Sequence, residues 1–313
     1  MIQTNTTVDA DHSSSGVLLI SAGGKGCEAA DKARRLLGEV ECTTPYYHIS
    51  IDTDSAQTSL ADVHINISIN ATQAATIKAN AIQFGPVVVK ILEHLDHMFD
   101  PVELEHGART TPAMTQVMFE YHKHKLISHM RKAIDHLKRS CRKIRIFIVH
   151  STGGGSGRAI SILLPLCLAE SSFRTSLTYG YDPNILEVPA TISGYAINHA
   201  RHDATEQQAV KICANHVAWS RESDFLLRNQ KLMYAAHVGY SNHSAVNSTA
   251  EELTDVMAEA IFDLLTNFPY FKSRWVDSVS SPKDSLRATD LPEERFPSVK
   301  EERRRQLENK DNN

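Results

Sequence analysis

Several features that would assign this 313-residue chain to a special class are missing. No apolar run reaches about eighteen residues, the length that a membrane-spanning helix needs. The polar start lacks the charged-then-apolar order of a secretion signal. The five cysteines form no Cys-x-x-Cys pair, which favours reduced thiols. The sequence therefore predicts a soluble, cytoplasmic protein with no membrane segment, and a flexible tail over residues 1–15.

Motifs of several common catalytic sites are also absent. No Gly-Lys-Ser/Thr closes a Walker A loop, no Gly-x-Ser-x-Gly marks a nucleophile, and no His-Glu-x-x-His marks a metal site. His122, His129 and His136 recur every seven residues, which predicts a polar helix face and no metal site. The net charge of −4 makes a nucleic-acid partner unexpected.

A glycine-rich stretch is the most informative segment present. Residues 151–158, Ser-Thr-Gly-Gly-Gly-Ser-Gly-Arg, follow the apolar run 144–149 and precede the mostly apolar run 159–169. This order predicts a strand, a glycine loop and a helix. Bare amides at a helix N-terminus bind anions, and such a loop suits a phosphate chain. A glycine-rich tight turn is the alternative.

A second unit of the same kind lies near the N-terminus. Residues 16–20 predict a short buried strand, residues 21–27 (Ser-Ala-Gly-Gly-Lys-Gly-Cys) a loop, and residues 28–37 a helix. A strand over 46–51 follows and ends in Asp52-Thr53-Asp54. An acid at this place holds ribose hydroxyls in dinucleotide enzymes, so a dinucleotide-binding oxidoreductase stays open.

The rest of the chain continues to alternate strands and helices. Helices are predicted over 71–99 with a break at Gly85-Pro86, over 113–140, 201–219 and 247–265; strands are predicted over 187–193 and 231–238. The alternation predicts an α/β fold, with a Rossmann-like, mainly parallel sheet and helices on both faces. Ligands of such sheets lie beyond the carboxyl ends of the strands, where both glycine loops are expected.

One long stretch is strongly basic. Between residues 123 and 145 there are nine Lys and Arg and a single acid, Asp135. A solvated helix face is the expected role, and a partner-binding or filament-contact face is the alternative.

The motifs resemble those of one superfamily, that of tubulin and the bacterial division protein FtsZ. Residues 153–157, Gly-Gly-Gly-Ser-Gly, resemble its signature phosphate loop, Gly-Gly-Gly-Thr-Gly-x-Gly, with Ser as in phage tubulins. Residues 22–27 resemble its first nucleotide loop. Residues 51–57 resemble the FtsZ stretch Asn-Thr-Asp-Ala-Gln, and residues 107–112 the loop that meets the γ-phosphate. The resemblance covers about 17–265 and is nearest in style to divergent bacterial or phage tubulin-like proteins.

The resemblance implies a guanine-nucleotide site. The residues that it implies are Gly23, Gly24, Lys25, Gly26, Cys27, Asp52, Gly107, Ala108, Arg109, Thr110, Thr152, Gly153, Gly154, Gly155, Ser156, Gly157, Arg201 and Asn247. GTP or GDP is the implied ligand, with Mg²⁺ as a candidate companion ion. Asn247 offers a donor and an acceptor to guanine, and it also suits the N-cap of its helix.

The resemblance also implies a division of the chain. Residues 16–246 correspond to the nucleotide-binding domain, 247–268 to the long core helix, and 269–313 to a short C-terminal segment with a charged, disordered tail. The second domain of the superfamily is then missing or vestigial. Asp277 is the candidate for the catalytic acid that follows the core helix.

Three functions remain open from the sequence. The first is a tubulin- or FtsZ-like guanine-nucleotide-binding protein that hydrolyses GTP and assembles head to tail into filaments. The second is a non-hydrolysing nucleotide-binding module that partners a polymer-former. The third is the dinucleotide-binding oxidoreductase.

Overall fold

The computed structural model describes residues 15–38, 40, 42, 44–95, 108, 111–195, 205–237 and 250–276. Within these ranges the strands form one six-stranded sheet in which every pairing is parallel. Across the sheet, the order is β3 (Val63–Asn66), β2 (Tyr46–Asp52), β1 (Ser15–Ala22), β4 (Lys143–Ser151), β5 (Ala190–Gly194) and β6 (Ala235–His237). The predicted α/β fold with a mainly parallel sheet is confirmed.

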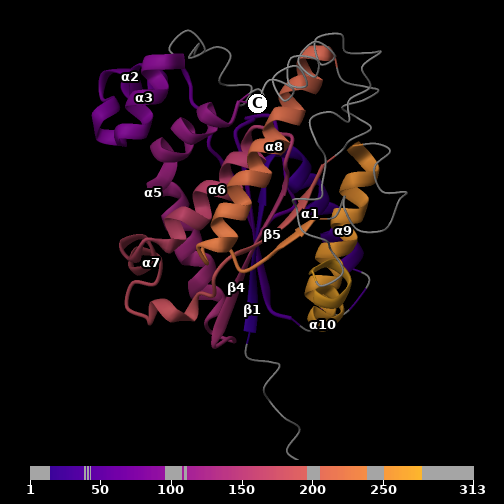
Figure 1. Ribbon diagram of the computed structural model, residues 1–313. Helices are drawn as coiled ribbons and strands as arrows, with labels where there is room; N and C mark the ends of the chain where they lie inside the picture. Colours follow the sequence, from indigo (N-terminus) through magenta and orange to yellow (C-terminus); the bar gives the residue numbers. More distant parts are fainter. Residues whose placement is uncertain are drawn as a thin grey trace, which may run out of the picture.

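Helices cover both faces of the sheet, as Figure 1 shows. One face carries α5 (Pro112–Leu137), α6 (Ser156–Ala169) and α7 (Ser171–Leu177), with α8 (Glu206–Arg228) packed on α6. The other face carries α1 (Gly23–Leu37), α9 (Ala250–Thr266) and α10 (Phe268–Phe271), which continues into a π-helical turn at Lys272–Val276. The short helices α2 (Ala71–Ala79), a 3₁₀ turn (Ala81–Phe84) and α3 (Pro86–Leu95) project from the body beside α5. A further 3₁₀ turn lies at Pro183–Ile185.

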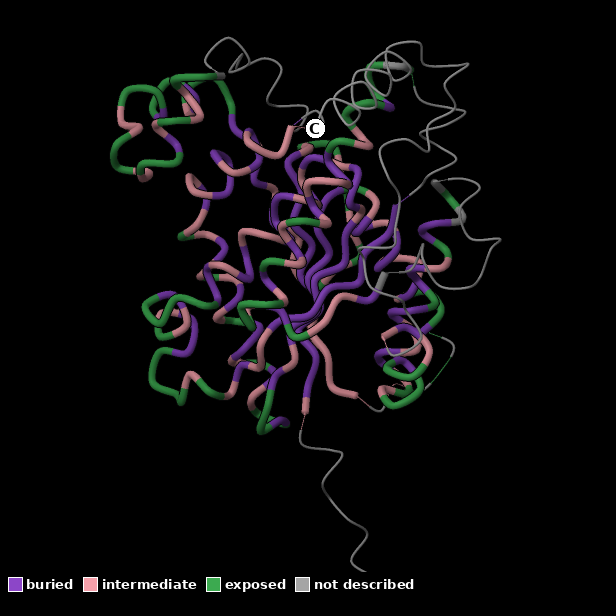
Figure 2. The backbone as a smooth tube through the Cα atoms, viewed as in Figure 1, coloured by how far each residue is buried: buried purple, intermediate pink, exposed green. Residues whose placement is uncertain are grey.

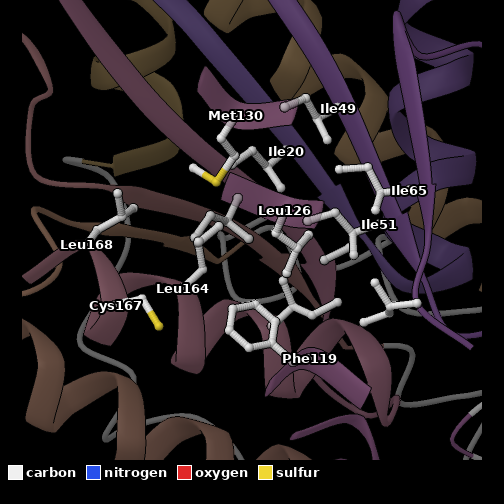
Figure 3. Packing of buried hydrophobic residues seen from close by; sticks show 14 of the residues in the cluster. Ile20, Ile49, Ile51, Ile65, Phe119, Leu126, Met130, Leu164, Cys167 and Leu168 are labelled. Atoms are coloured by element: carbon white, nitrogen blue, oxygen red, sulfur yellow. The ribbon is translucent and has the colours of Figure 1, made fainter. Parts of the chain in front are cut away.

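The strands divide their side chains between two hydrophobic cores. In β1, Leu18 and Ile20 face the core under α5 and α6, whereas Val17 and Leu19 face the core under α1 and α9. This alternation is the two-residue period of a strand. Figure 2 shows the central strands buried along most of their length. Figure 3 shows the first core around Phe119, Leu126 and Met130 of α5. Burial on both faces explains why these strands read as continuous apolar runs.

Local signals explain several boundaries. Gly85 has φ +98°, a conformation that favours glycine, and Pro86 begins α3, so the predicted break is confirmed. Thr205 caps α8, and its hydroxyl and Gln208 form a capping box. Helix α8 extends to Arg228, well beyond the predicted end at Trp219. The sequence did not predict β3 or α7, which are short.

The segment after α9 belongs to the core. Phe271 and Trp275 are fully buried in the second core, and the Trp275 indole nitrogen donates to Asp263 Oδ2 at 2.8 Å. Residues 268–276 are therefore a folded extension of α9. Of the tail predicted over residues 1–15, Ser15 begins β1 and the rest lies outside the described residues, as do residues 277–313 of the predicted C-terminal segment.

Two expectations from composition can be compared with the described part of the chain. No single helix there is long and apolar enough to cross a bilayer, and the one pair that qualifies jointly, Ser156–Ala169 with Ser171–Leu177, is bent by 93°. All five cysteines are free.

Candidate functional site

Two helices begin where two neighbouring strands end. Helix α1 starts at Gly23, directly after β1, and α6 starts at Ser156, with four residues between it and the end of β4. The glycine loops predicted over 21–27 and 151–158 are therefore shorter than expected, because each helix starts inside its glycine stretch. Only residues 152–155 form a loop.

The position of these two helices creates a crevice. β1 and β4 are hydrogen-bonded neighbours, but α1 lies on one face of the sheet and α6 on the other. This is the place where the strand order reverses, and ligands of open parallel sheets bind there. The N-termini of α1 and α6 both lie at this crevice, and each carries the positive end of its helix dipole.

Three glycines fix how closely the two units approach. Gly23 has φ +71°, and a Cβ there would lie 2.7 Å from the Gly157 amide nitrogen. A Cβ on Gly157 would lie 2.7 Å from the Ala22 carbonyl oxygen. A Cβ on Gly26 would collide with the Val149 carbonyl oxygen. The backbones of the two units are thus in direct contact, and packing alone requires glycine at these three positions.

Both glycine segments open onto a single cleft of about 640 Å³. Its lining comprises Ala22, Gly23, Gly24, Lys25, Glu28, Asp31, Arg35, Gln57, Ser151, Gly153, Gly154, Gly155, Ser156, Gly157, Tyr195, Ile212 and Leu253. The early and the mid-chain glycines therefore converge, as the sequence predicted. The sequence did not predict the apolar wall formed by Tyr195, Ile212 and Leu253, because it comes from three distant elements.

Two cleft glycines have no packing reason to be glycine. A Cβ on Gly154 would meet nothing within 4 Å, and its φ lies outside the left-handed region. A Cβ on Gly24 would meet only the Gln57 and Asp52 side chains, at ordinary contact distances of 3.6 and 3.8 Å. Both residues line the cleft. Absence of a side chain there leaves the backbone open to a ligand.

Other predicted residues lie behind the cleft instead of lining it. Gly26 packs on β4, and Cys27 is buried with its thiol beside Ser21. Because α1 starts at Gly23, Cys27 is already one turn inside the helix and faces the core. Burial raises the pKa of this thiol to about 12, so it stays protonated near neutrality. Thr152 is also buried, and its amide and hydroxyl both donate to the Gly194 carbonyl oxygen.

Residues at the end of β2 lie behind the cleft and are hydrogen-bonded to the segments that line it. Asp52 is 3% exposed, and its Oδ1 accepts from the amides of Thr53 at 2.6 Å and Asp54 at 3.1 Å. Burial raises the pKa of the Asp52 carboxyl above its usual value. The Thr53 hydroxyl lies 2.6 Å from Ser156 Oγ and accepts from the Ala108 amide at 3.0 Å. Thr53 therefore joins three of the segments predicted to form the site.

Charged side chains occupy one rim. Lys25 Nζ lies 2.7 Å from Glu28 Oε2, and Thr254 Oγ1 of α9 donates to Glu28 Oε1 at 3.1 Å. Burial opposes ionisation of Glu28, but the hydrogen bond and charge of Lys25 outweigh it and hold the pKa of Glu28 below its usual value. Lys25 is therefore already paired at the cleft.

Several predicted site residues lie outside the described residues. They are Gly107, Arg109, Thr110, Arg201, Asn247 and Asp277. Of the segment expected to meet the γ-phosphate, only Ala108 before the helix and Thr111 with Pro112 at its start are described. No group of three His, Cys, Asp or Glu in the described ranges is placed to hold a metal ion.

The polar face predicted for the histidines of α5 is confirmed only in part, because His136 is exposed whereas His122 is buried. His122 is buried, and its Nε2 lies 2.9 Å from the Ser68 carbonyl oxygen. Burial lowers its pKa. His136 packs its ring against Tyr47 at 5.4 Å. The face is therefore buried where it meets the chain after β3 and exposed near the C-terminal end of α5.

Much of the basic stretch is also tied to the protein. Arg131 donates twice to the Ser176 carbonyl oxygen, Lys143 donates to the Asn184 carbonyl oxygen at 2.7 Å, and Lys138 lies over the Tyr181 ring. These cations hold α7 and the segment after it against α5, the residue that follows α5 and the start of β4. The basic stretch is therefore not only a solvated helix face, because several of its cations bind backbone carbonyl oxygens or an aromatic ring of the same chain.

The sequence and the fold were compared with known proteins. No family model matches the sequence, and no curated protein matches it. Among solved structures, CetZ2 of Haloferax volcanii in a GTPγS-bound protofilament is 13% identical, with a TM-score of 0.48 over 80% of this chain and 58% of that chain. TubZ of Clostridium botulinum phage c-st is 11% identical, with a TM-score of 0.42 over 80% and 58%.

An FtsZ dimer from M. jannaschii is 11% identical, with a TM-score of 0.45 over 80% of this chain and 55% of that chain. This chain thus spans little more than half the length of these structures. In fold, it is similar to CetZ, TubZ and FtsZ.

Proposed function

We propose that this protein binds a guanine nucleotide, with the phosphate chain held by backbone amides at the N-termini of α1 and α6. The observation that supports this most is the pair Gly24 and Gly154. Both line one cleft at the strand-order reversal, and the protein's own packing gives neither a reason to lack a side chain. A ligand that approaches the backbone supplies that reason.

The lining divides the proposed roles. The amides of Gly154, Gly155, Ser156 and Gly157 would hold the β- and γ-phosphates, and Gly24 with Lys25 would lie near the α-phosphate and sugar. Lys25 adds a positive charge only if it leaves Glu28. A cleft of about 640 Å³ is within the range of small-molecule sites. The choice of guanine rests on the resemblance of the motifs.

Mg²⁺ would depend on the nucleotide for its ligands. The described residues offer no cluster of three protein ligands, and Mg²⁺ commonly takes one or two carboxylates together with substrate phosphates. Asp31 and Glu28 are the carboxylates of the cleft lining.

The dinucleotide alternative has less support. It relies on Asp52 to hold ribose hydroxyls, but Asp52 is 3% exposed and does not line the cleft. The two remaining alternatives, a GTPase that assembles into filaments and a non-hydrolysing module that partners a polymer-former, share the same site. Light scattering after addition of GTP, with released phosphate measured in parallel, separates them.

The experiment that tests binding is titration of a fluorescent GTP analogue, with competition by GTP, GDP, ATP and NADH. We expect guanine nucleotides to compete and NADH not to. Gly154→Asp places a negative charge among the amides and should abolish binding. Thr72→Asp, which makes the same charge change on the exposed surface of α2, should bind like the unmodified protein. Full binding by Gly154→Asp would contradict the site.

A further inference from the structure

One face of α8 holds the central glycine segment. Its residues have the spacing i, i+3, i+4 and i+7, so they form one stripe along the helix. The members of this stripe are Ile212, Asn215, His216 and Trp219. His216 Nδ1 lies 2.8 Å from Thr152 Oγ1, and the Trp219 indole nitrogen donates to Ser161 Oγ at 3.1 Å. The stripe therefore contacts the first residue of the loop and the helix that follows the loop.

Asn215 contacts the loop itself. Its side chain is 8% exposed, and Nδ2 donates to the carbonyl oxygens of Gly153 at 3.0 Å and Gly154 at 3.4 Å. Carbonyl oxygens only accept hydrogen bonds, so the amide nitrogen and not the amide oxygen must face them. One side chain thus fixes the direction of two successive peptide groups.

Peptide geometry determines where the amides of this segment point. In a trans peptide the C=O of one residue and the N–H of the next point in opposite directions. No cis peptide bond occurs among the described residues. The N–H groups of Gly154 and Gly155 therefore point away from Asn215. Both glycines line the cleft, whereas Asn215 does not.

We propose that Asn215 is the positioning residue of the anion-binding loop. It holds the loop carbonyls against α8, so that the amides of Gly154 and Gly155 donate into the cleft. This inference rests on the proposed function for its ligand, a phosphate chain. Glycine peptides rotate freely, and Gly154 has no close neighbour on its Cβ side to restrain it. The hydrogen bonds from Asn215 to the Gly153 and Gly154 carbonyl oxygens supply the restraint on the loop backbone.

The test compares Asn215→Leu with Ser223→Ala, a buried side chain about two turns further along α8 that donates only locally, to Ser220. Isothermal titration measures the affinities for GTP and for guanosine. Asn215→Leu should weaken GTP binding by about 10- to 100-fold, the range of hydrogen bonds to charged groups, and leave guanosine binding unchanged. Ser223→Ala should change neither. Equal losses for both ligands, or no loss for GTP, would overturn the proposal.

A measurement without ligand separates this inference from the proposed function. Backbone amide order parameters of Gly154 and Gly155, from ¹⁵N relaxation, should be lower in Asn215→Leu than in the unmodified protein and in Ser223→Ala. Unchanged order parameters would overturn the positioning role. If Asn215→Leu does not fold, Asn215→Asp keeps the size and replaces the donor by acceptors, and the same lower order parameters are expected. Should the unmodified protein bind no guanine nucleotide, the proposed function fails while the order parameters still decide the role of Asn215.

Discussion

Glycine has two different roles at the cleft, and the surroundings of the missing Cβ tell them apart. At Gly157 a Cβ would meet the backbone of β1, so the residue is needed for packing. At Gly154 a Cβ would enter open space above the loop. A sequence pattern shows both as the same letter. The structure is needed to say which glycine serves the fold and which leaves room for a ligand.

This difference predicts opposite outcomes for two similar substitutions. Gly157→Ala should lower the free energy of unfolding by about 1–3 kcal/mol, because its Cβ overlaps the Ala22 carbonyl oxygen. Gly154→Ala should change it by less than about 0.5 kcal/mol but weaken nucleotide binding. Urea unfolding followed by the fluorescence of the two buried tryptophans measures the first quantity. If both variants lost stability equally, packing would explain Gly154 as well.

Three histidines that are at most 1% exposed predict a pH dependence. Burial lowers the pKa of His48 and His216 to about 4, and that of His150 to about 3. Since the unfolded chain binds protons near pH 6.5 and the folded chain does not, stability is full above that pH and falls as the pH drops toward 4. Each histidine contributes a slope of up to about 1.4 kcal/mol per pH unit.

Urea unfolding between pH 4.5 and 7.5 checks this. His150→Phe keeps a ring beside Trp219 and should lower the slope by one histidine's share. The comparison between the two proteins isolates His150 from Asp52, whose raised pKa has the opposite effect on stability. An unchanged slope in His150→Phe would mean that His150 binds a proton in the folded protein.

At the scale of elements, periodicity and glycine position predicted most of the α/β alternation. The apolar runs of β1 and β4 are visible because both faces of these strands are buried. Helix starts were predicted too late, because glycine was taken as loop when it occupies the first turns of α1 and α6. The role of Asn215 was not predicted. The spacing Ile212, Asn215, His216 and Trp219 was the available signal, but no sequence pattern says which loop that face meets.

The segment after α9 predicts a measurable contribution to stability. Trp275→Ala should lower the free energy of unfolding by about 3–5 kcal/mol, because this side chain is 1% exposed in the second core. Tyr270→Ala is the matched control from the same segment; its side chain is 50% exposed, so it should cost less than about 1 kcal/mol. Guanidinium unfolding measures both. Similar small effects would mean that α10 and the π-helical turn are dispensable to the core.

At the scale of the whole molecule, the site depends on strand order, which no local pattern encodes. The sequence predicted a parallel sheet and two glycine units. Their convergence requires β1 and β4 to be neighbours and α1 and α6 to lie on opposite faces. Long-range contacts of the chain decide both. The apolar wall from Tyr195, Ile212 and Leu253 could not be predicted either, because long-range contacts bring these three residues together.

A ligand at this crevice would contact both layers of the molecule, so binding should stabilise the whole fold. At a GTP concentration 100 times the dissociation constant, the free energy of unfolding should rise by about 2.7 kcal/mol. Thermal unfolding across a GTP series measures this, with ATP as the control nucleotide. Gly154→Asp should show no dependence on GTP. A melting temperature that is insensitive to GTP in the unmodified protein would contradict the proposed function.

The backbone contact between Gly23 and Gly157 has a consequence for how the cleft tolerates change. The width of the cleft is set by contact between two backbone segments. A change of side-chain rotamer cannot alter this width. The separation of the two helix N-termini is therefore the same before and after a ligand binds. Side chains at the entrance of the cleft can then be replaced without changing this separation.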